Sequence, residues 1–176
     1  MIRLAQLCLA LLFLAGLSAP AQAQWNGDAE FCASGQGTQP QRIHYCTLAI
    51  TSGVLTKENL ATTYYNRGTA FDINDEFENA IADYSEAIKL NPNDVDFYFN
   101  RASAYIAMGD NGRALEDLSA AIKLAPDDGG IFYSRGLILE AQGDLEGAKT
   151  DFQRAYELAP DVPEIQAKAQ EQGLTQ

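Results

Sequence analysis

Side chains that could perform catalysis or hold a metal ion are scarce in this sequence of 176 residues. It has one histidine, His44, and three cysteines, Cys8, Cys32 and Cys46, which is too few for the usual site with several His and Cys ligands. No Ser or Cys stands in a nucleophile signature. Residues 127–130 (Asp-Asp-Gly-Gly) lack the spaced carboxylates of a calcium loop and are interpreted as a turn. We predict no enzyme, cofactor or metal, although 24 acidic residues keep a glycosidase-type carboxylate pair as an alternative.

Residues 1–23 have the features of a secretory signal peptide. Arg3 is a short positive start, Leu7–Leu17 is apolar, and Ala21–Ala23 is a small-x-small cleavage pattern. The apolar run is far shorter than the ~20 residues of a membrane-spanning helix. We expect cleavage after Ala23, export and no membrane insertion, with an uncleaved anchor as the alternative. The short positive region is similar to bacterial signals and favours a Gram-negative periplasm over the extracellular medium.

Export determines how the cysteines are interpreted. Cleavage removes Cys8 and leaves Cys32 and Cys46 as an even pair in an oxidising compartment, where a disulfide is favoured. Closing this loop would stabilise the fold by ~3 kcal/mol in the chain-entropy model. The alternative is a pair of free or redox-active thiols, which would favour a C-x-x-C spacing or basic surroundings.

A motif of aromatic, basic and small residues recurs with a 34-residue period, without insertion or deletion. The three copies are Tyr64-x-x-Arg67-Gly68-x-x-Phe71, Tyr98-x-x-Arg101-Ala102-x-x-Tyr105 and Phe132-x-x-Arg135-Gly136-x-x-Leu139. They continue with Ala80, Ala114 and Ala148, and then with Pro92, Pro126 and Pro160. A repeat of this period indicates a solenoid, in which each unit buries its apolar face against its neighbours.

Each copy is predicted to form two helices. In the second copy Tyr98, Ala102 and Tyr105 follow the three- and four-residue steps of an amphipathic helix. A break at Gly109 precedes a second periodic run, which ends before Pro126 because proline cannot continue the helix. Small residues let the two helices approach closely. Gly68, Ala102 and Gly136 are expected to face Ala80, Ala114 and Ala148.

These residues resemble the tetratricopeptide repeat family over residues 61–162. The resemblance implies an all-α fold, a right-handed α-solenoid of antiparallel helix pairs. We assign repeats to 61–94, 95–128 and 129–162, an N-terminal cap to 24–60, and a capping helix and tail to 163–176. One departure is Asn111, which replaces the large apolar residue that Phe77 and Leu145 supply in the other copies. Together with Gly112, it is expected to weaken the second repeat, because Gly in a helix costs ~1 kcal/mol.

An aspartate follows each repeated arginine at the same 16-residue offset. The three pairs are Arg67 and Asp83, Arg101 and Asp117, and Arg135 and Asp151. In the antiparallel helix pair that the resemblance implies, this offset can bring the two side by side. We predict an Arg–Asp ion pair in every repeat, within the unit or across to its neighbour. The alternative is an arginine ladder that binds an anionic ligand.

Both ends of the mature chain are interpreted as caps. Residues 41–53 have helical spacing and indicate the second helix of a degenerate unit. Cys46 then takes the place of Ala80, and Cys32 lies on the remnant of the preceding helix, so that the disulfide staples the cap. Thr56 is a good N-cap. Pro163 begins a polar helix of the kind that keeps a solenoid soluble.

In the family, the first helix of each repeat lines the concave face. The residues expected there are Tyr65, Thr69, Asp72, Asp96, Phe99, Asn100, Ser103, Ile106, Tyr133, Leu137 and Glu140. Tyr65, Phe99 and Tyr133 form an aromatic row that suits an extended peptide or an amphipathic helix, unless the rings simply complete the core. Some family members hold a terminal carboxylate there with Lys, Asn and Arg. Only Asn100 of that set is present, so no such clamp is expected.

The charge balance restricts the partner. The net charge is −12, which repels phosphate backbones and excludes nucleic acid as the expected ligand. A neutral or basic protein segment is favoured, with salt-sensitive binding. We therefore expect an exported, non-catalytic scaffold of the cell envelope that binds a protein or peptide on its concave face. The alternatives are a self-associating structural protein (a homo-oligomer) and an envelope enzyme.

Overall fold

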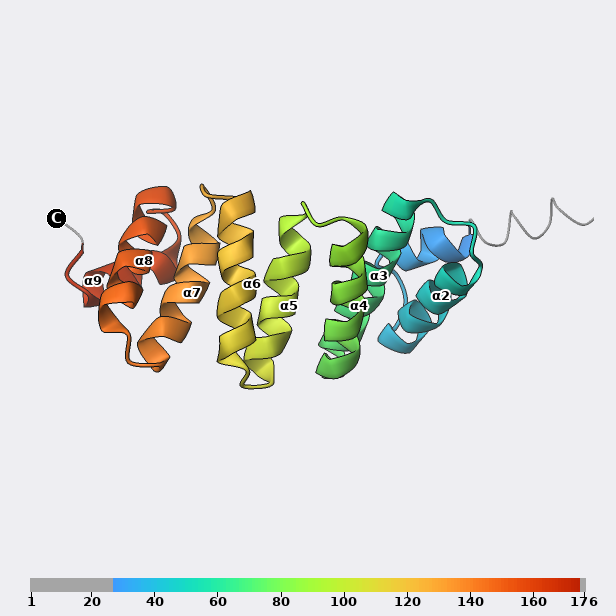
Figure 1. The fold of residues 1–176 in the computed structure, drawn as a ribbon, viewed down its shortest axis with the longest axis horizontal. Coiled ribbons are helices and arrows are strands. Elements are labelled where there is room, and N and C mark those ends of the chain that lie inside the picture. Colours follow the sequence, from blue (N-terminus) through green and yellow to red (C-terminus); the bar gives the residue numbers. More distant parts are fainter. Residues whose placement is uncertain (1–26, 175–176) are drawn as a thin grey trace, which may run out of the picture.

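The computed structural model describes residues 27–174, and this part of the chain folds into helices and turns, without strands. After a short helix at 27–33, the helices are α2 (Gln39–Thr51), α3 (Lys57–Ile73), α4 (Phe77–Leu90), α5 (Val95–Ala107), α6 (Asn111–Leu124), α7 (Gly129–Ala141), α8 (Leu145–Leu158) and α9 (Pro163–Glu171). Each packs against the next along the chain, so they form one row (Figure 1). The predicted all-α solenoid is confirmed. The predicted signal peptide lies outside the described residues.

The 34-residue period is visible in the backbone. The turn within each helix pair contains one residue with left-handed φ, at Asp75 (58°), Gly109 (76°) and Gly143 (85°). This conformation suits glycine, and aspartate is among the few other residues that tolerate it. The helices α4, α6 and α8 all end one residue before the C-cap that precedes a proline. None of the helices within 27–174 is long and apolar enough to cross a membrane.

The two helices of a repeat meet at a glycine and an aromatic ring. A Cβ atom on Gly68 would lie 2.9 Å from the ring of Tyr84, and one on Gly136 would lie 2.7 Å from the ring of Phe152. The expected neighbour of Gly68, Ala80, lies one turn earlier, and its backbone oxygen would be 3.3 Å from the same Cβ atom, so the ring is nearer than the alanine. The ring occupies the space of the missing Cβ, so the glycine is required where the second helix carries an aromatic residue.

Replacing Gly136 with Ala is therefore expected to lower the free energy of unfolding by about 1–2 kcal/mol, because overpacking outweighs the gain in helix propensity. Gly112 is the matched control, since a Cβ there meets nothing nearer than 3.7 Å. Gly112→Ala is expected to stabilise by less than the ~1 kcal/mol of a helix interior, because Gly112 is the second residue of α6. Urea unfolding followed by circular dichroism measures both. Equal stabilisation by the two substitutions would contradict the ring contact.

The N-terminal cap differs from its expected alignment by one helical turn. Arg101 donates a hydrogen bond to Ser85, 16 residues earlier, whereas Arg67 donates to Thr47, 20 residues earlier. The four additional residues lie in α3, which has 17 residues where α5 has 13. Cys46, next to Thr47, therefore stands in the place of Tyr84 and not of Ala80. The sequence alignment was wrong because a degenerate unit has no repeated spacing to fix its register.

The predicted disulfide is confirmed. Cys32, in the helix at 27–33, is bonded to Cys46 of α2, with 4.9 Å between their Cα atoms. Both cysteines are buried. The helix at 27–33 is much shorter than α3, α5 or α7, and the covalent bond links it to α2.

The start of α6 is better supported than its sequence suggests. Asn111 and Gly112 are the first two residues of this helix, so the glycine is not in the helix interior. The Asp110 carboxylate accepts a hydrogen bond from the backbone N–H of Arg113 and also pairs with its guanidinium. A cap of this kind contributes about 1 kcal/mol, which is as large as the weakening that we expected for the second repeat.

Candidate functional site

The three repeated arginines lie between helices and not on an open surface. Each guanidinium donates two hydrogen bonds to the two carboxylate oxygens of the aspartate 16 residues later, at 2.7–2.8 Å. The carboxylates are almost fully buried. Their relative exposures are 4% for Asp83, 5% for Asp117 and 3% for Asp151. This bidentate geometry is the strong form of the Arg–carboxylate interaction.

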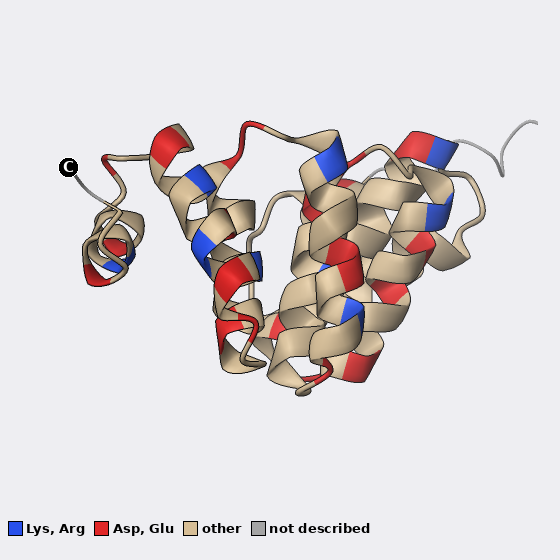
Figure 2. Cartoon of the chain, turned by 60° about the vertical axis from the view of Figure 1, so that its left-hand side comes forward, with Lys and Arg blue, Asp and Glu red and all other residues tan. Residues whose placement is uncertain are grey.

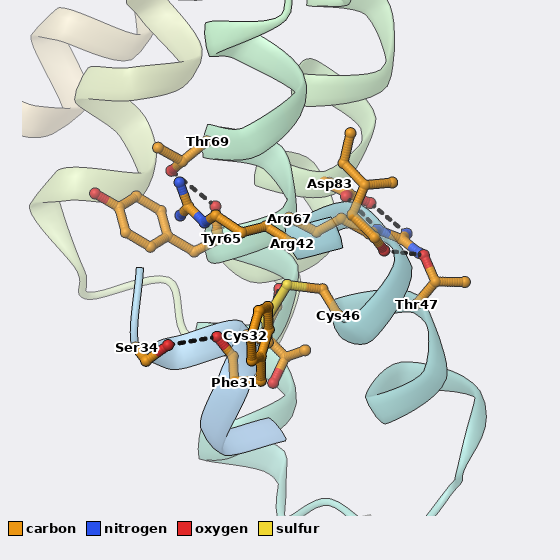
Figure 3. The surroundings of a disulfide bond; sticks show 12 residues. Phe31, Cys32, Ser34, Arg42, Cys46, Thr47, Tyr65, Arg67, Thr69 and Asp83 are labelled. Atoms are coloured by element: carbon orange, nitrogen blue, oxygen red, sulfur yellow. Dashed lines mark hydrogen bonds and ion pairs between the residues drawn. A yellow bond between two sulfur atoms is a disulfide. The ribbon is translucent and has the colours of Figure 1, made fainter. Parts of the chain in front are cut away.

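Each arginine also contacts the preceding unit. Its Nη1 donates to a hydroxyl group on the second helix of that unit, at 3.0 Å in Thr47, 2.9 Å in Ser85 and 3.3 Å in Ser119. Figure 3 shows Arg67 between Asp83 and Thr47, beside the disulfide. The contact therefore runs both within the repeat and across to its neighbour. These arginines join three helices, and this role disfavours a ladder for anionic ligands. The hydroxyl partners were missed, although Ser85 and Ser119 also recur at the repeat period.

The surface formed by the exposed sides of α3, α5 and α7 is here named the first-helix face, and it carries the residues expected to bind a partner. Its aromatic row is partly built into the core. The Tyr65 ring packs against the Phe97 ring, with 5.1 Å between the ring centroids. The Tyr65 hydroxyl accepts a hydrogen bond from the side-chain amide of Asn100 at 2.8 Å. The Tyr133 ring lies 6.0 Å from that of Phe152. All three rings of the row keep intermediate exposure.

The polar residues expected on this face divide into engaged and exposed groups. Thr69 and Ser103 donate to carbonyl oxygens of their own helices. Asp72 is half-buried, and this burial, with the nearby charge of Asp75, raises the pKa of its carboxyl. Asp96 is exposed, as is Leu137.

Glu140 is held by the C-terminal cap. The ammonium group of Lys168 in α9 lies 2.8 Å from its carboxylate, and the side-chain amide of Gln172 donates to it at 3.0 Å. The buried residues of α9 are Ile165 and Ala169. Glu140 thus fixes the capping helix and is not free for a partner. Lys168 and Gln172 have no counterpart in the repeats, so no pattern in the sequence pointed to this contact.

The charges are distributed unevenly over the described residues. Every Lys and Arg there lies within a helix, whereas Asp and Glu also occupy the turns (Figure 2). On α3, α5 and α7 the basic residues are Lys57 and the three arginines that are paired with aspartates. Burial, followed by the charges of Asp96 and Asp94, raises the pKa of the Tyr65 hydroxyl. The first-helix face is therefore negatively charged.

Two pockets lie between α5 and α7 on this face. The acidic pocket, about 190 Å³, is lined by Val95, Asp96, Phe99, Asp128, Gly130 and Ile131. The aliphatic pocket, about 250 Å³, is lined by Ile106, Asn111, Ser134, Leu137, Ile138 and Ala141. Within residues 27–174 no group of three or more His, Cys, Asp or Glu side chains could hold a metal ion. The arrangement suits binding of side chains in two small pockets.

Two family models match the chain. One, described as TPR repeat, matches residues 74–109, and the other, described as tetratricopeptide repeat, matches residues 99–163. Together they span residues 74–163, which is about half of the sequence. None of the curated proteins matches.

Solved structures of similar shape include MamA proteins and a TPR domain with a bound peptide. A crystal structure of MamA is 27% identical, with a TM-score of 0.65, covering 74% of this chain and 71% of that one. The first TPR domain of Spaghetti (RPAP3), bound to the HSP90 peptide SRMEEVD, is 25% identical, with a TM-score of 0.62 and coverages of 69% and 96%. MamA from Desulfovibrio magneticus RS-1 is 18% identical, with a TM-score of 0.74 and coverages of 88% and 84%, and supports the fold alone.

Proposed function

Because this chain belongs to the tetratricopeptide repeat family, we propose that it is a non-catalytic scaffold that binds a segment of another protein on its first-helix face. The observation that carries the proposal is the composition of that face. It combines partly exposed aromatic rings, exposed aliphatic side chains and unpaired carboxylates, and its arginines are engaged between helices. Such a surface can bury apolar side chains and attract positive charge, but it assembles no nucleophile with a base.

The preferred ligand charge differs from that of one structural neighbour. The peptide in the RPAP3 structure, SRMEEVD, has three acidic residues and one basic residue. Here Asp94, Asp96 and Asp128 lie at the start of α5 and α7, and the only basic residue on α3, α5 or α7 outside the Arg–Asp pairs is Lys57. An acidic ligand would be repelled, so the partner segment is neutral or basic.

We expect this chain to bind a charge-reversed peptide, SRMKKVK, and not SRMEEVD. The affinity for the basic peptide should fall as salt rises, since the screening length shortens from ~30 Å at 0.01 M to ~8 Å at 0.15 M ionic strength. Fluorescence anisotropy with labelled peptides, in a salt series, measures both affinities. Binding of SRMEEVD at least as tightly as of its basic counterpart would contradict the charge argument.

We also propose that the protein is exported, to a Gram-negative periplasm. Two features support this: the signal-like composition of residues 1–23, and the disulfide between Cys32 and Cys46, which fits an oxidising compartment. N-terminal sequencing of the protein from an envelope fraction is expected to begin at Gln24. An intact Met1 on protein that remains in the cytosol would refute export.

A further inference from the structure

One departure from the repeat, Asn111, lines the aliphatic pocket. Phe77 begins α4 and packs against the core cluster that contains Ala104 of α5. Asn111 occupies the equivalent position of the next repeat, at the start of α6, and its short side chain does not fill the corresponding space against α7. The second repeat thus has an opening on the first-helix face where the first repeat has a ring.

The lining of this pocket is suited to an apolar side chain. Ile106 and Leu137 stand at its edge with 40% and 39% of their surface exposed, and Ile138 and Ala141 add to the wall. Asn111 and Ser134 are its two polar lining residues. A large aliphatic group placed there would remove both exposed residues from water, which is favourable in proportion to the apolar area buried.

The acidic pocket at the other end of α5 and α7 has complementary chemistry. Asp128 caps α7 by accepting the N–H of Gly130 at 2.8 Å, and Asp96 is exposed in the first turn of α5. Neither carboxylate makes an ion pair within residues 27–174. Two uncompensated carboxylates beside the Phe99 ring favour a cationic side chain, which ring and carboxylates can both contact.

The distance between the two pockets determines how far apart a basic and an aliphatic side chain must lie in a bound segment. Asp96 and Ile106 lie ten residues apart in α5, a rise of about 15 Å. An extended chain advances about 3.3 Å per residue and covers this distance in about four or five residues. We propose that the bound segment is extended and carries one basic and one large aliphatic side chain, about four or five residues apart. This inference rests on the proposed function. The basic group lies at the acidic pocket and the aliphatic group in the aliphatic pocket.

The test uses a series of blocked peptides in a serine–alanine background. Each carries one arginine and one leucine, and their separation varies from adjacent to about eight residues. Titrations are followed by ¹H–¹⁵N NMR of the mature chain with its disulfide intact, because chemical shifts detect weak binding and locate it. We expect the tightest binding at a separation of four or five residues, with shifts in α5 and α7, and about tenfold weaker binding when leucine is replaced by serine.

A substitution that fills the pocket provides the decisive comparison. Asn111→Phe introduces the residue that the first repeat has at this position, and Asn111→Leu is the smaller substitute should the first not fold. Either is expected to abolish the preference for leucine. Leu145→Phe is the matched control, because it lies in the same repeat position, is 64% exposed and is outside both pockets. It should leave the preference unchanged.

The outcomes separate this inference from the proposed function. Shifts on α3, α5 and α7 that do not depend on leucine, on its separation from arginine or on Asn111 would overturn the inference and leave the proposed function standing. Absence of shifts on these helices with every peptide would count against both. A dimer in light scattering that Asn111→Phe dissociates would identify a second copy as the occupant and also overturn the inference.

Discussion

Replacing Arg101 with Met is expected to lower the free energy of unfolding by about 3 kcal/mol, because it leaves a buried carboxylate without its partner. Asp117 is 5% exposed and accepts both of its bonds from Arg101. The same substitution removes the hydrogen bond to Ser85 in the preceding repeat. Arg101 is preferred to Arg67 and Arg135 as the test site because the second repeat has a full repeat on each side.

The double variant shows whether the two residues act as a pair. Asp117→Leu alone is also expected to be destabilising, but a buried ion pair replaced by two apolar residues is often close to neutral. The double variant, with both Arg101→Met and Asp117→Leu, should therefore lose less free energy of unfolding than the two single variants together. The difference is expected to be at least about 1 kcal/mol. Lys89→Met is the control, since the Lys89–Glu86 pair is exposed and should contribute under about 1 kcal/mol. Additive losses in urea unfolding would refute the coupling.

Removing the disulfide is the second large effect. In the variant with Cys32→Ser and Cys46→Ser, the free energy of unfolding is expected to fall by about 3 kcal/mol. The reason is that a bond that closes a loop of this length restricts the unfolded chain. The damage should be local to the N-terminal cap. α2 would lose its covalent link to the helix at 27–33, and the hydrogen bond between Thr47 and Arg67 would be weakened with it.

Hydrogen exchange distinguishes a local from a global effect. Amides of residues 27–51 are expected to lose protection in the cysteine variant, while those of α5 to α8 keep it, since in a solenoid each unit contacts only its neighbours. Wild-type protein treated with a reductant is the control for the two serines and should behave in the same way. Uniform loss of protection along the whole chain would show that the cap is not a separate unit.

The sequence was most informative where a pattern was repeated. Three copies of an arginine and an aspartate at one offset were enough to place each pair side by side, because residues that recur at the repeat period occupy equivalent positions in the solenoid. The same repetition predicted the two helices of each unit and their ends before prolines.

Features that occur once were harder to predict. The additional turn of α3 moved Cys46 by one turn relative to the repeats, and no second copy of the cap was present to show the shift. The contact of Lys168 with Glu140 joins a repeat to a helix outside the period. The sequence shows that a large side chain is absent at Asn111, but only the packing of α6 against α7 shows that a pocket lies beside it.

The most direct test of the scaffold function compares which partner is captured by the wild-type protein and by two variants with the same change in net charge. Immobilised wild-type protein is exposed to an envelope extract of the cells that produce it, beside Asp96→Lys on the first-helix face and Glu116→Lys on the second helix of the same repeat. Both sites are exposed, and both variants change the net charge by the same amount. We predict that wild type and Glu116→Lys retain the same specific partner and that Asp96→Lys loses it. Retention of that partner by Asp96→Lys, or its loss only in Glu116→Lys, would contradict a binding site on the first-helix face.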